Sequence, residues 1–168
     1  MKREEHIMKV CHTEAMKKIK EYEEQKRILI RQEYDNSTIS YKEGEKKIAS
    51  NYDYKKTRAD IAMLDKKIRD IRAKLAYANC TVKVEKFNIT IGEALVMLAQ
   101  MQQEKHVVES LSYRTQLTRR LTTNGILEYT ECLYNPEDAS FDAEALRQKI
   151  GDLQIAIDKA NLTNEIDI

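Results

Sequence analysis

The chain lacks several features that mark particular classes of protein. Its 168 residues include one proline, four glycines and no tryptophan, which is few turn-forming residues for a sheet protein and ordinary for long helices. Lysine plus arginine number 29 against 28 acidic residues, so the overall positive field typical of duplex-DNA binders is missing. With 34% charged residues and a mean hydropathy of −0.65, little apolar material remains for a thick core. We therefore expect a mostly α protein with thin, elongated helical packing.

Long apolar runs and paired cysteines are also missing. The first eight residues contain no apolar stretch of the kind found in signal peptides, and no run is long enough to cross a bilayer. Cys11, Cys80 and Cys132 are far apart and form no C-x-x-C spacing, which is typical of reduced thiols. These observations predict a cytoplasmic protein that binds neither membranes nor duplex nucleic acid.

The sequence also lacks the common catalytic and metal-binding motifs. No phosphate-binding loop, dinucleotide-binding glycine pattern or nucleophile elbow is present. No histidine follows a glutamate at the Glu-x-x-His spacing of di-iron bundles, and Cys11-His12 has no second pair at zinc-finger spacing. An enzyme would need His106, Glu109 and a cysteine to converge in a pocket. We expect a non-catalytic protein without metal or cofactor.

One pattern occurs twice in the chain. Residues 68–84 and 150–166 each carry a heptad-spaced apolar stripe that runs into Ala-Asn-x-Thr, with Asn79 in the first copy and Asn161 in the second. One helix cannot bury such a stripe alone, so the repeat predicts helices that form a core with each other or with another chain. Each Asn-x-Thr is interpreted as a helix end, with Asn79 in the left-handed conformation. A pair of polar groups facing one pocket is the alternative.

The spacing of apolar residues predicts four helices and two extended segments. The helices are expected at about 3–34, 51–78, 90–124 and 142–163, the extended segments at 82–89 and 126–134, and a loop or short hairpin at 36–49. Thr90 and Glu93 form a capping box that starts the third helix, and Asn124, followed by glycine, ends it. Asp142 is expected to cap the last helix, with Phe141 in a hydrophobic staple. The two extended segments are expected to pair as a small two-stranded β-element.

Residues from about 55 to 168 resemble a known family. The stretch Thr-Ile-Gly-Glu-Ala-Leu at 90–95, the long helix after it, and the C-terminal segment that ends Ala-Asn-Leu-Thr-Asn-Glu-Ile are similar to the septicolysin-like family of small bacterial helical proteins. The earlier Ala-Asn-Cys-Thr also fits, because two helices of that family close with Asn-x-Thr. The resemblance implies a helical, oligomeric fold of unassigned biochemical role. The N-terminal helix and the loop around Tyr41 depart from the family.

One polar cluster, at residues 112–124, is a candidate for ligand recognition. Arginine offers a planar fork that matches phosphate, hydroxyl groups add donors, and a tyrosine ring can stack on a base. The candidate ligand-binding residues are Tyr113, Arg114, Thr118, Arg119, Arg120, Asn124 and Tyr129. A solvated helix face whose arginines pair with neighbouring carboxylates is the simpler interpretation, and general experience with charged helix faces favours it.

The sequence as a whole predicts a coiled-coil-like bundle of long antiparallel helices that assembles into a symmetric homo-oligomer. Residues 1–50 are expected to form an N-terminal amphipathic helix and loop, and 51–168 a helical core with two similar helix–Asn-x-Thr units. The leading functional hypothesis is a non-catalytic oligomer that binds or sequesters an anionic, nucleotide-like, phosphorylated small molecule at inter-subunit surfaces. Phage proteins that sequester a nucleotide defence signal are an analogy, because they too are small oligomers without enzyme motifs. The alternative is a structural coiled-coil scaffold that binds protein partners.

Overall fold

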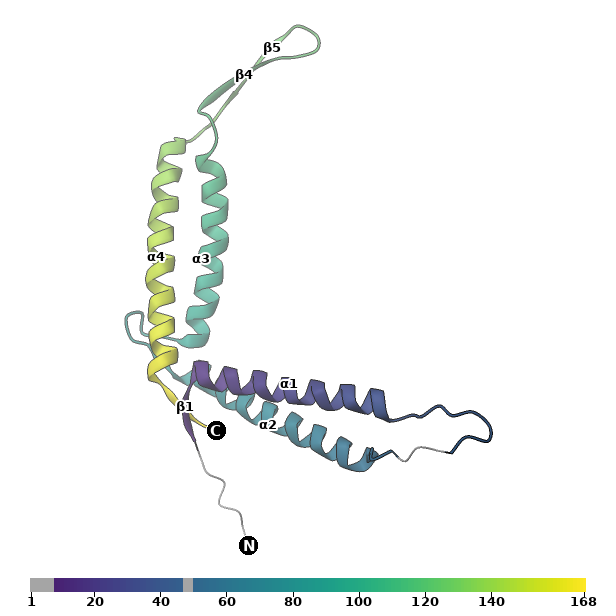
Figure 1. Ribbon diagram of the computed structural model, residues 1–168. Coiled ribbons are helices and arrows are strands. Elements are labelled where there is room, and N and C mark those ends of the chain that lie inside the picture. Colours follow the sequence, from purple (N-terminus) through teal and green to yellow (C-terminus); the bar gives the residue numbers. More distant parts are fainter. Residues whose placement is uncertain (1–7, 47–49) are drawn as a thin grey trace. The chain divides into compact units, whose positions relative to one another are not determined.

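The computed structural model describes residues 8–46 and 50–168 of the chain. Over these residues the protein is mostly helical, with antiparallel helix packing and three small two-stranded sheets (Figure 1). The helices are α1 (His12–Asn36), α2 (Tyr54–Thr81), α3 (Ile91–Ser112) and α4 (Pro136–Thr163). The strands are β1 (Lys9–Cys11), β2 (Lys83–Val84), β3 (Ile89–Thr90), β4 (Leu117–Leu121), β5 (Leu127–Glu131) and β6 (Glu165–Asp167). This architecture confirms the predicted fold class.

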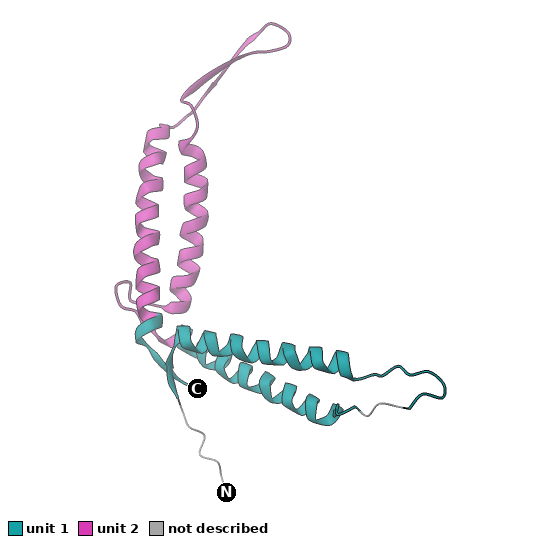
Figure 2. Ribbon diagram, in the orientation of Figure 1, with its two compact units in different colours: residues 1–79, 161–168 teal, residues 80–160 magenta. Residues whose placement is uncertain are grey.

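The chain folds into two compact units, which are coloured separately in Figure 2. Unit 1 consists of residues 1–79 and 161–168, and unit 2 consists of residues 80–160. Unit 1 therefore combines the N-terminal helices with the end of the chain. This division differs from the predicted one, which placed a boundary between residues 50 and 51.

Unit 1 is built on the antiparallel pair α1 and α2, which lie side by side (Figure 1). The apolar positions of α2 that step by three and four residues are buried as the heptad pattern predicts; they are Ile61, Leu64, Ile68, Ile71, Leu75 and Ala78. Ala15 and Ile19 of α1 pack against this seam. α1 contributes little to the core because most of its surface is charged.

A short sheet joins the two ends of the chain inside unit 1. Val10 of β1 is opposite Ile166 of β6, and the backbones of Met8 and Ile168 exchange hydrogen bonds of 3.0 and 2.9 Å. The expectation that Met8 and Cys11 belong to the first helix is therefore wrong, because α1 begins at His12. Strand pairing between residues more than 150 positions apart leaves no local periodicity to read. Residues 1–7 lie outside the described residues.

The first helix ends in the run Asp35-Asn-Ser-Thr38, whose short polar side chains favour a turn. α1 stops at Asn36, whose side-chain amide donates to the carbonyl of Gln32 at 2.8 Å. The chain beyond it, as far as residue 46, contains a turn in which the N–H of Glu45 donates to the carbonyl of Lys42 at 3.0 Å. The rest of the predicted loop or hairpin, residues 47–49, lies outside the described residues.

Unit 2 is built on α3 and α4. Its buried core consists of Val84, Ile91, Ala94, Leu153, Ile157 and Ala160. The capping box of the third helix is confirmed, because Thr90 Oγ1 accepts from the N–H of Glu93 at 3.2 Å and Glu93 Oε2 accepts from the N–H of Thr90 at 2.7 Å. Segment 82–89 does not pair with 126–134. It folds back on itself as the β2–β3 hairpin, since Asn88 takes a left-handed turn conformation with φ +53°.

Two predicted helix ends are wrong. α3 ends at Ser112 instead of Asn124, because residues 117–121 gain a strand partner in 127–131. α4 starts at Pro136, where a proline needs no N–H partner, so Asp142 and Phe141 lie within the helix and Phe141 is 73% exposed. The prediction that each Asn-x-Thr ends a helix is confirmed, because α2 ends at Thr81 and α4 ends at Thr163. The predicted left-handed conformation of Asn79 is wrong, since Asn88 is the one non-glycine residue with positive φ in the described part of the chain.

Candidate functional site: the β4–β5 hairpin

The predicted ligand cluster folds as a β-hairpin at the far end of unit 2 (Figure 1). Four β-branched threonines at 115, 118, 122 and 123 favour extended chain, and Asn124-Gly125 is the strongest short-range turn signal. Gly125 has φ +75°, which suits glycine. The N–H of Thr122 donates to the carbonyl of Ile126 at 2.8 Å and closes the turn. The same dipeptide that predicted a helix end therefore reverses a strand.

The base of the hairpin is tied to the end of α3. The hydroxyl of Tyr134 donates at 2.9 Å to the carbonyl of Leu111, which lies in the last turn of α3. Gln116 and Cys132 exchange two hydrogen bonds, of 2.9 and 3.0 Å, just before β4 and after β5. Partial burial raises the pKa of Tyr134. These bonds attach the base of the hairpin to the end of α3. The rest of the hairpin extends away from the helices (Figure 1).

The strand register divides the hairpin side chains between two faces. Directly opposite residues share a face, and successive residues alternate. The leucine face consists of Leu117, Arg119 and Leu121 of β4 with Leu127, Tyr129 and Glu131 of β5. The threonine face consists of Thr118 and Arg120 of β4 with Glu128 and Thr130 of β5. One face is therefore apolar apart from two charges, and the other is polar throughout.

Neither face is covered within the chain. Every residue of both strands is exposed; on the leucine face, Leu117, Leu121, Leu127 and Tyr129 are 53%, 66%, 45% and 62% exposed. An isolated two-stranded hairpin is marginal in water, because it needs a third strand or a packed face to become stable. A contiguous exposed apolar surface rimmed by charge is typical of interaction sites.

The seven predicted ligand-binding residues do not converge in one chain. Arg119 and Tyr129 are opposite each other on the leucine face, whereas Thr118 and Arg120 are on the threonine face. Tyr113 is the C-cap of α3, followed directly by Arg114, and Asn124 lies in the hairpin turn. The interpretation as a helix face is wrong, since the segment is a strand. One chain by itself therefore offers no pocket lined by this set.

The three arginines of the cluster have no acidic partner among the described residues. Over residues 8–46 and 50–168, none of Arg114, Arg119 and Arg120 forms an ion pair, although thirteen such pairs occur elsewhere in that part of the chain. Arg120 and Glu128 are opposite each other without pairing. Their positive charge is therefore available to a ligand or to a second chain.

The helix that carries the hairpin is apolar on more than one side. α3 contains four charged residues among 22, and apolar residues occur all round its circumference. The side toward α4 holds the core, yet Leu95, Val96 and Val107 are 44%, 59% and 52% exposed. A helix that is apolar all round belongs in an interior. Because the apolar residues are spread around the helix, they form no single stripe that the sequence pattern would reveal.

One ion-pair group ties the hairpin end of α3 to α4. Glu109 accepts from Arg147 at 3.1 Å and is 3.6 Å from Lys105. The hydrogen bond from Arg147 is the largest cause that lowers the pKa of the Glu109 carboxyl, and the charge of Lys105 adds to it. The carboxylate that an enzyme would need beside His106 is thus engaged by arginine.

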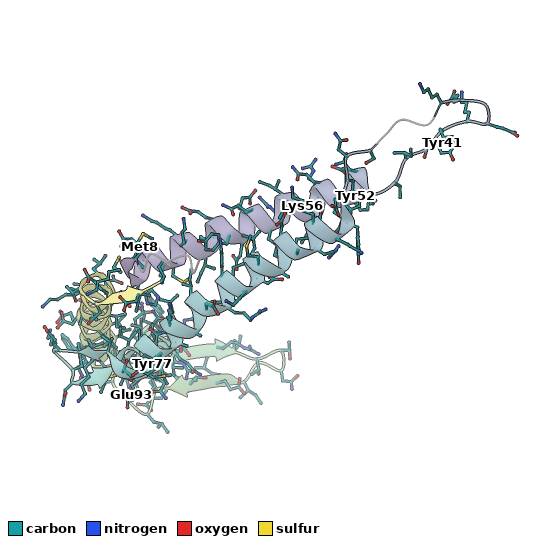
Figure 3. The ribbon with its side chains drawn as sticks, turned by 90° about the horizontal axis from the view of Figure 1, so that it is seen from below. Met8, Tyr41, Tyr52, Lys56, Tyr77 and Glu93 are labelled. Atoms are coloured by element: carbon teal, nitrogen blue, oxygen red, sulfur yellow. The ribbon has the colours of Figure 1, made fainter. Side chains whose placement is uncertain are left out.

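A second candidate site lies where α1 ends and α2 begins, marked by Tyr52 and Lys56 in Figure 3. A polar hollow of about 370 Å³ lies there. In its wall the buried carboxylate of Glu33 accepts from the Tyr52 hydroxyl at 2.7 Å and from Arg58 Nε at 2.9 Å. Burial and the bond to Glu33 raise the pKa of Tyr52 to about 12. Because the carboxylate is already satisfied, this group joins the two helices and is a weak candidate for ligand binding.

Other kinds of site find no support in the residues described. That part of the chain holds no cluster of three or more histidine, cysteine or acidic side chains placed to bind a metal ion. None of its helices has the length and apolar character needed to span a bilayer. Asn79 and Asn161 each bury a side-chain oxygen with no hydrogen-bond donor among the described atoms, so the pocket interpretation of the repeat stays a prediction.

Comparison with known proteins supports the fold. No protein-family model matches the chain, and no curated protein matches it. Among solved structures, it is similar to a conserved protein of unknown function from Corynebacterium diphtheriae, with a TM-score of 0.59 and 13% sequence identity. The match covers 95% of this chain and 99% of that chain. At this identity the likeness concerns the fold alone, and a bacterial protein shares it over almost its whole length.

Proposed function

We propose that the protein is a non-catalytic, self-assembling scaffold whose copies contact one another through unit 2. The observation that carries this proposal is the apolar circumference of α3. α4 covers one side of that helix, and three aliphatic side chains on other sides stay at least two-fifths exposed. Within the described residues, these side chains are therefore only partly covered. A second copy supplies the missing cover.

Energetics and symmetry favour a copy of the same chain. Apolar surface contributes roughly 25 cal/mol for each Å² removed from water, so covering several aliphatic side chains stabilises an assembly. Most soluble oligomers are symmetric homo-oligomers, in which one patch meets the same patch on its partner. α3 has the composition of such a patch, because its few charges are spread among Ala, Leu, Val and Met.

The experiment is a measurement of particle mass against concentration by analytical ultracentrifugation. Wild-type protein is expected to be a multimer, and Val96→Glu and Val107→Glu are expected to dissociate it, because a buried carboxylate without a partner is costly. Ile30→Glu is the matched control: Ile30 is 45% exposed on α1 of unit 1, so the same chemical change is expected to leave the mass unaltered. A monomeric wild type at every concentration would contradict the proposal.

A second candidate function is binding or sequestration of an anionic, nucleotide-like small molecule between copies. The observation that favours it is the unpaired state of Arg114, Arg119 and Arg120 within the described residues. Arg119 with Tyr129 offers a charged fork beside an aromatic ring, which suits a phosphate and a base. Since one chain does not bring the three arginines together, the ligand would lie at an inter-subunit surface. A phage protein that sequesters a defence signal is one form of this candidate.

Thermal unfolding across a panel of cyclic and linear nucleotides tests the second candidate. A ligand that binds the folded protein raises the unfolding temperature. We expect stabilisation by at least one nucleotide, and its loss in Arg119→Ala or Arg120→Ala. A flat response across the panel leaves the scaffold as the function.

We further propose membership of the septicolysin-like family and a cytoplasmic location. Family membership is supported by the segment at 90–95 and the C-terminal Ala-Asn-Leu-Thr-Asn-Glu-Ile, together with the fold shared with a bacterial protein. The cytoplasmic location is supported by the cysteines, which are free thiols.

A further inference from the structure

We infer that the β4–β5 hairpins of two copies stack through their leucine faces, with β4 of one copy lying over β5 of the other. This inference rests on the proposed self-assembly and adds the surface and the register. It commits to a second copy of this chain as the occupant of the leucine face. Because the leucine face is exposed and apolar, its burial by a partner is favourable. The distribution of charge on the face indicates that this partner is a second copy of the chain.

Charge separates the two strands of the hairpin. β4 carries Arg119 and Arg120 and no acidic residue, whereas β5 carries Glu128 and Glu131 and no basic residue. On the leucine face the two charges are Arg119 and Glu131, and neither belongs to an ion pair in the described part of the chain. The face is thus positive along one strand, negative along the other, and apolar between. A copy of the same face, turned so that opposite strands meet, is complementary to it.

Symmetry selects the arrangement. A two-fold axis parallel to the strands places β4 over β5 of the second copy, so that Leu121 meets Leu127 and Arg119 lies over Tyr129 and within reach of Glu131. Stacked sheets are about 10 Å apart, which an arginine side chain can bridge, and a guanidinium over a tyrosine ring adds a cation–π contact. A two-fold axis across the strands would set Arg119 against Arg119. Like charges in that position oppose association.

The size of the contact explains why the hairpin acts together with the helices. Stable interfaces bury about 800 Å² on each partner, and three leucines and a tyrosine that are 45% to 66% exposed supply only a part of that area. The exposed aliphatic residues of α3 supply apolar area in the same unit. The hairpin contributes the charge-matched part, which sets the orientation of the copies.

Charge reversal across the two strands tests the register. Arg119→Glu makes the leucine face wholly acidic, and Glu131→Arg makes it wholly basic. Each variant alone is expected to raise the dissociation constant of self-association by about tenfold or more, because every cross-copy charge pair becomes repulsive. An equimolar mixture of the two variants is expected to associate as tightly as wild type, since each charge pair between unlike copies again joins a carboxylate to a guanidinium. Sedimentation velocity with one variant fluorescently labelled measures mixed and unmixed species.

The threonine face provides the matched control. Arg120→Glu and Glu128→Arg make the same charge changes on the same two strands, but on the face that points away from the proposed contact. They are expected to leave the dissociation constant within about twofold of wild type, because exposed charges outside a contact contribute little. Circular dichroism of all four variants checks that the helical content is unchanged.

The outcomes separate this inference from the proposed function. A wild-type multimer whose mass responds to Val96→Glu but not to Arg119→Glu or Glu131→Arg keeps the scaffold and overturns the hairpin contact. Equal effects on both faces, or no recovery on mixing, also overturn it. A wild-type monomer overturns both proposals together.

Discussion

The two helix pairs of this protein are built from different surfaces. Twelve of the 25 residues of α1 are charged, against four of the 22 in α3. Ion pairs join α1 to α2 along the pair, with Lys26 2.7 Å from Asp65 and Arg72 2.6 Å from Glu23. Both α1 and α3 expose some aliphatic side chains, but those of α3 have few charges around them, and α3 leads into an uncovered hairpin. The comparison teaches that the same antiparallel pairing produces a largely charged helix surface in unit 1 and a more apolar one in unit 2.

The largest expected effect concerns the core of unit 2. Leu153 of α4 is fully buried, so Leu153→Ala is expected to lower the free energy of unfolding by about 2–5 kcal/mol, from lost transfer energy and the cavity left behind. Ile155, two positions away and 70% exposed, is the control. Chemical denaturation of dissociated protein measures both, and an equal loss for Ile155→Ala would show that the outer side of α4 is covered as well.

The next effect concerns the charged join of unit 1. Arg58→Ala removes the arginine that bonds both oxygens of Glu33, which is 8% exposed, and leaves Tyr52 as the remaining side-chain donor. We expect a loss of about 1–3 kcal/mol, the cost of a buried acceptor that loses a partner. Arg31→Ala, on a side chain 85% exposed, should cost no more than about 1 kcal/mol. Similar losses for both variants would mean that the Arg58–Glu33 pair stabilises unit 1 no more than an exposed surface ion pair does.

A smaller effect compares the starts of two helices. Thr90 caps α3 through its hydroxyl, so Thr90→Ala is expected to cost about 1 kcal/mol. Cys11 precedes α1, where the bond from its backbone N–H to Glu14 at 3.0 Å survives the loss of the thiol. Cys11→Ala should therefore change stability by only a few tenths of a kcal/mol. Thermal melts of the two variants measure the difference, and a larger loss for Cys11→Ala would reverse this ranking of the caps.

The smallest effect is a difference in alkaline stability. The pKa of Tyr52 rises from 10.0 to about 12 on folding, so the folded state retains this proton more strongly than the unfolded chain does. The stabilisation is complete below pH 10 and is lost as the pH rises through 12. We expect wild type to lose more stability over this window than Tyr52→Phe. Denaturant midpoints at several pH values test this, and parallel curves for the two proteins would contradict it.

Several features of the fold were readable because their cause is local. The seam from Ile61 to Ala78 follows from heptad spacing, the capping box at Thr90 from a hydroxyl three residues before a carboxylate, and the end of α1 from the polar run at 35–38. Each depends on residues within one or two turns. The positions of the candidate site residues were readable only as a cluster in sequence, since their faces depend on whether the segment is helix or strand.

Other features were decided by contacts between distant residues. Leu117–Leu121 is compatible with the end of a helix until 127–131 offers it a strand partner across Asn124-Gly125. β1 exists because the last residues of the chain pair with it. The sequence alone therefore determined the seam of α2, the capping box of α3 and the charge difference between β4 and β5. The tertiary structure decided which segments pair and which face each arginine occupies, because backbone hydrogen bonds between distant segments outweigh weak local propensities.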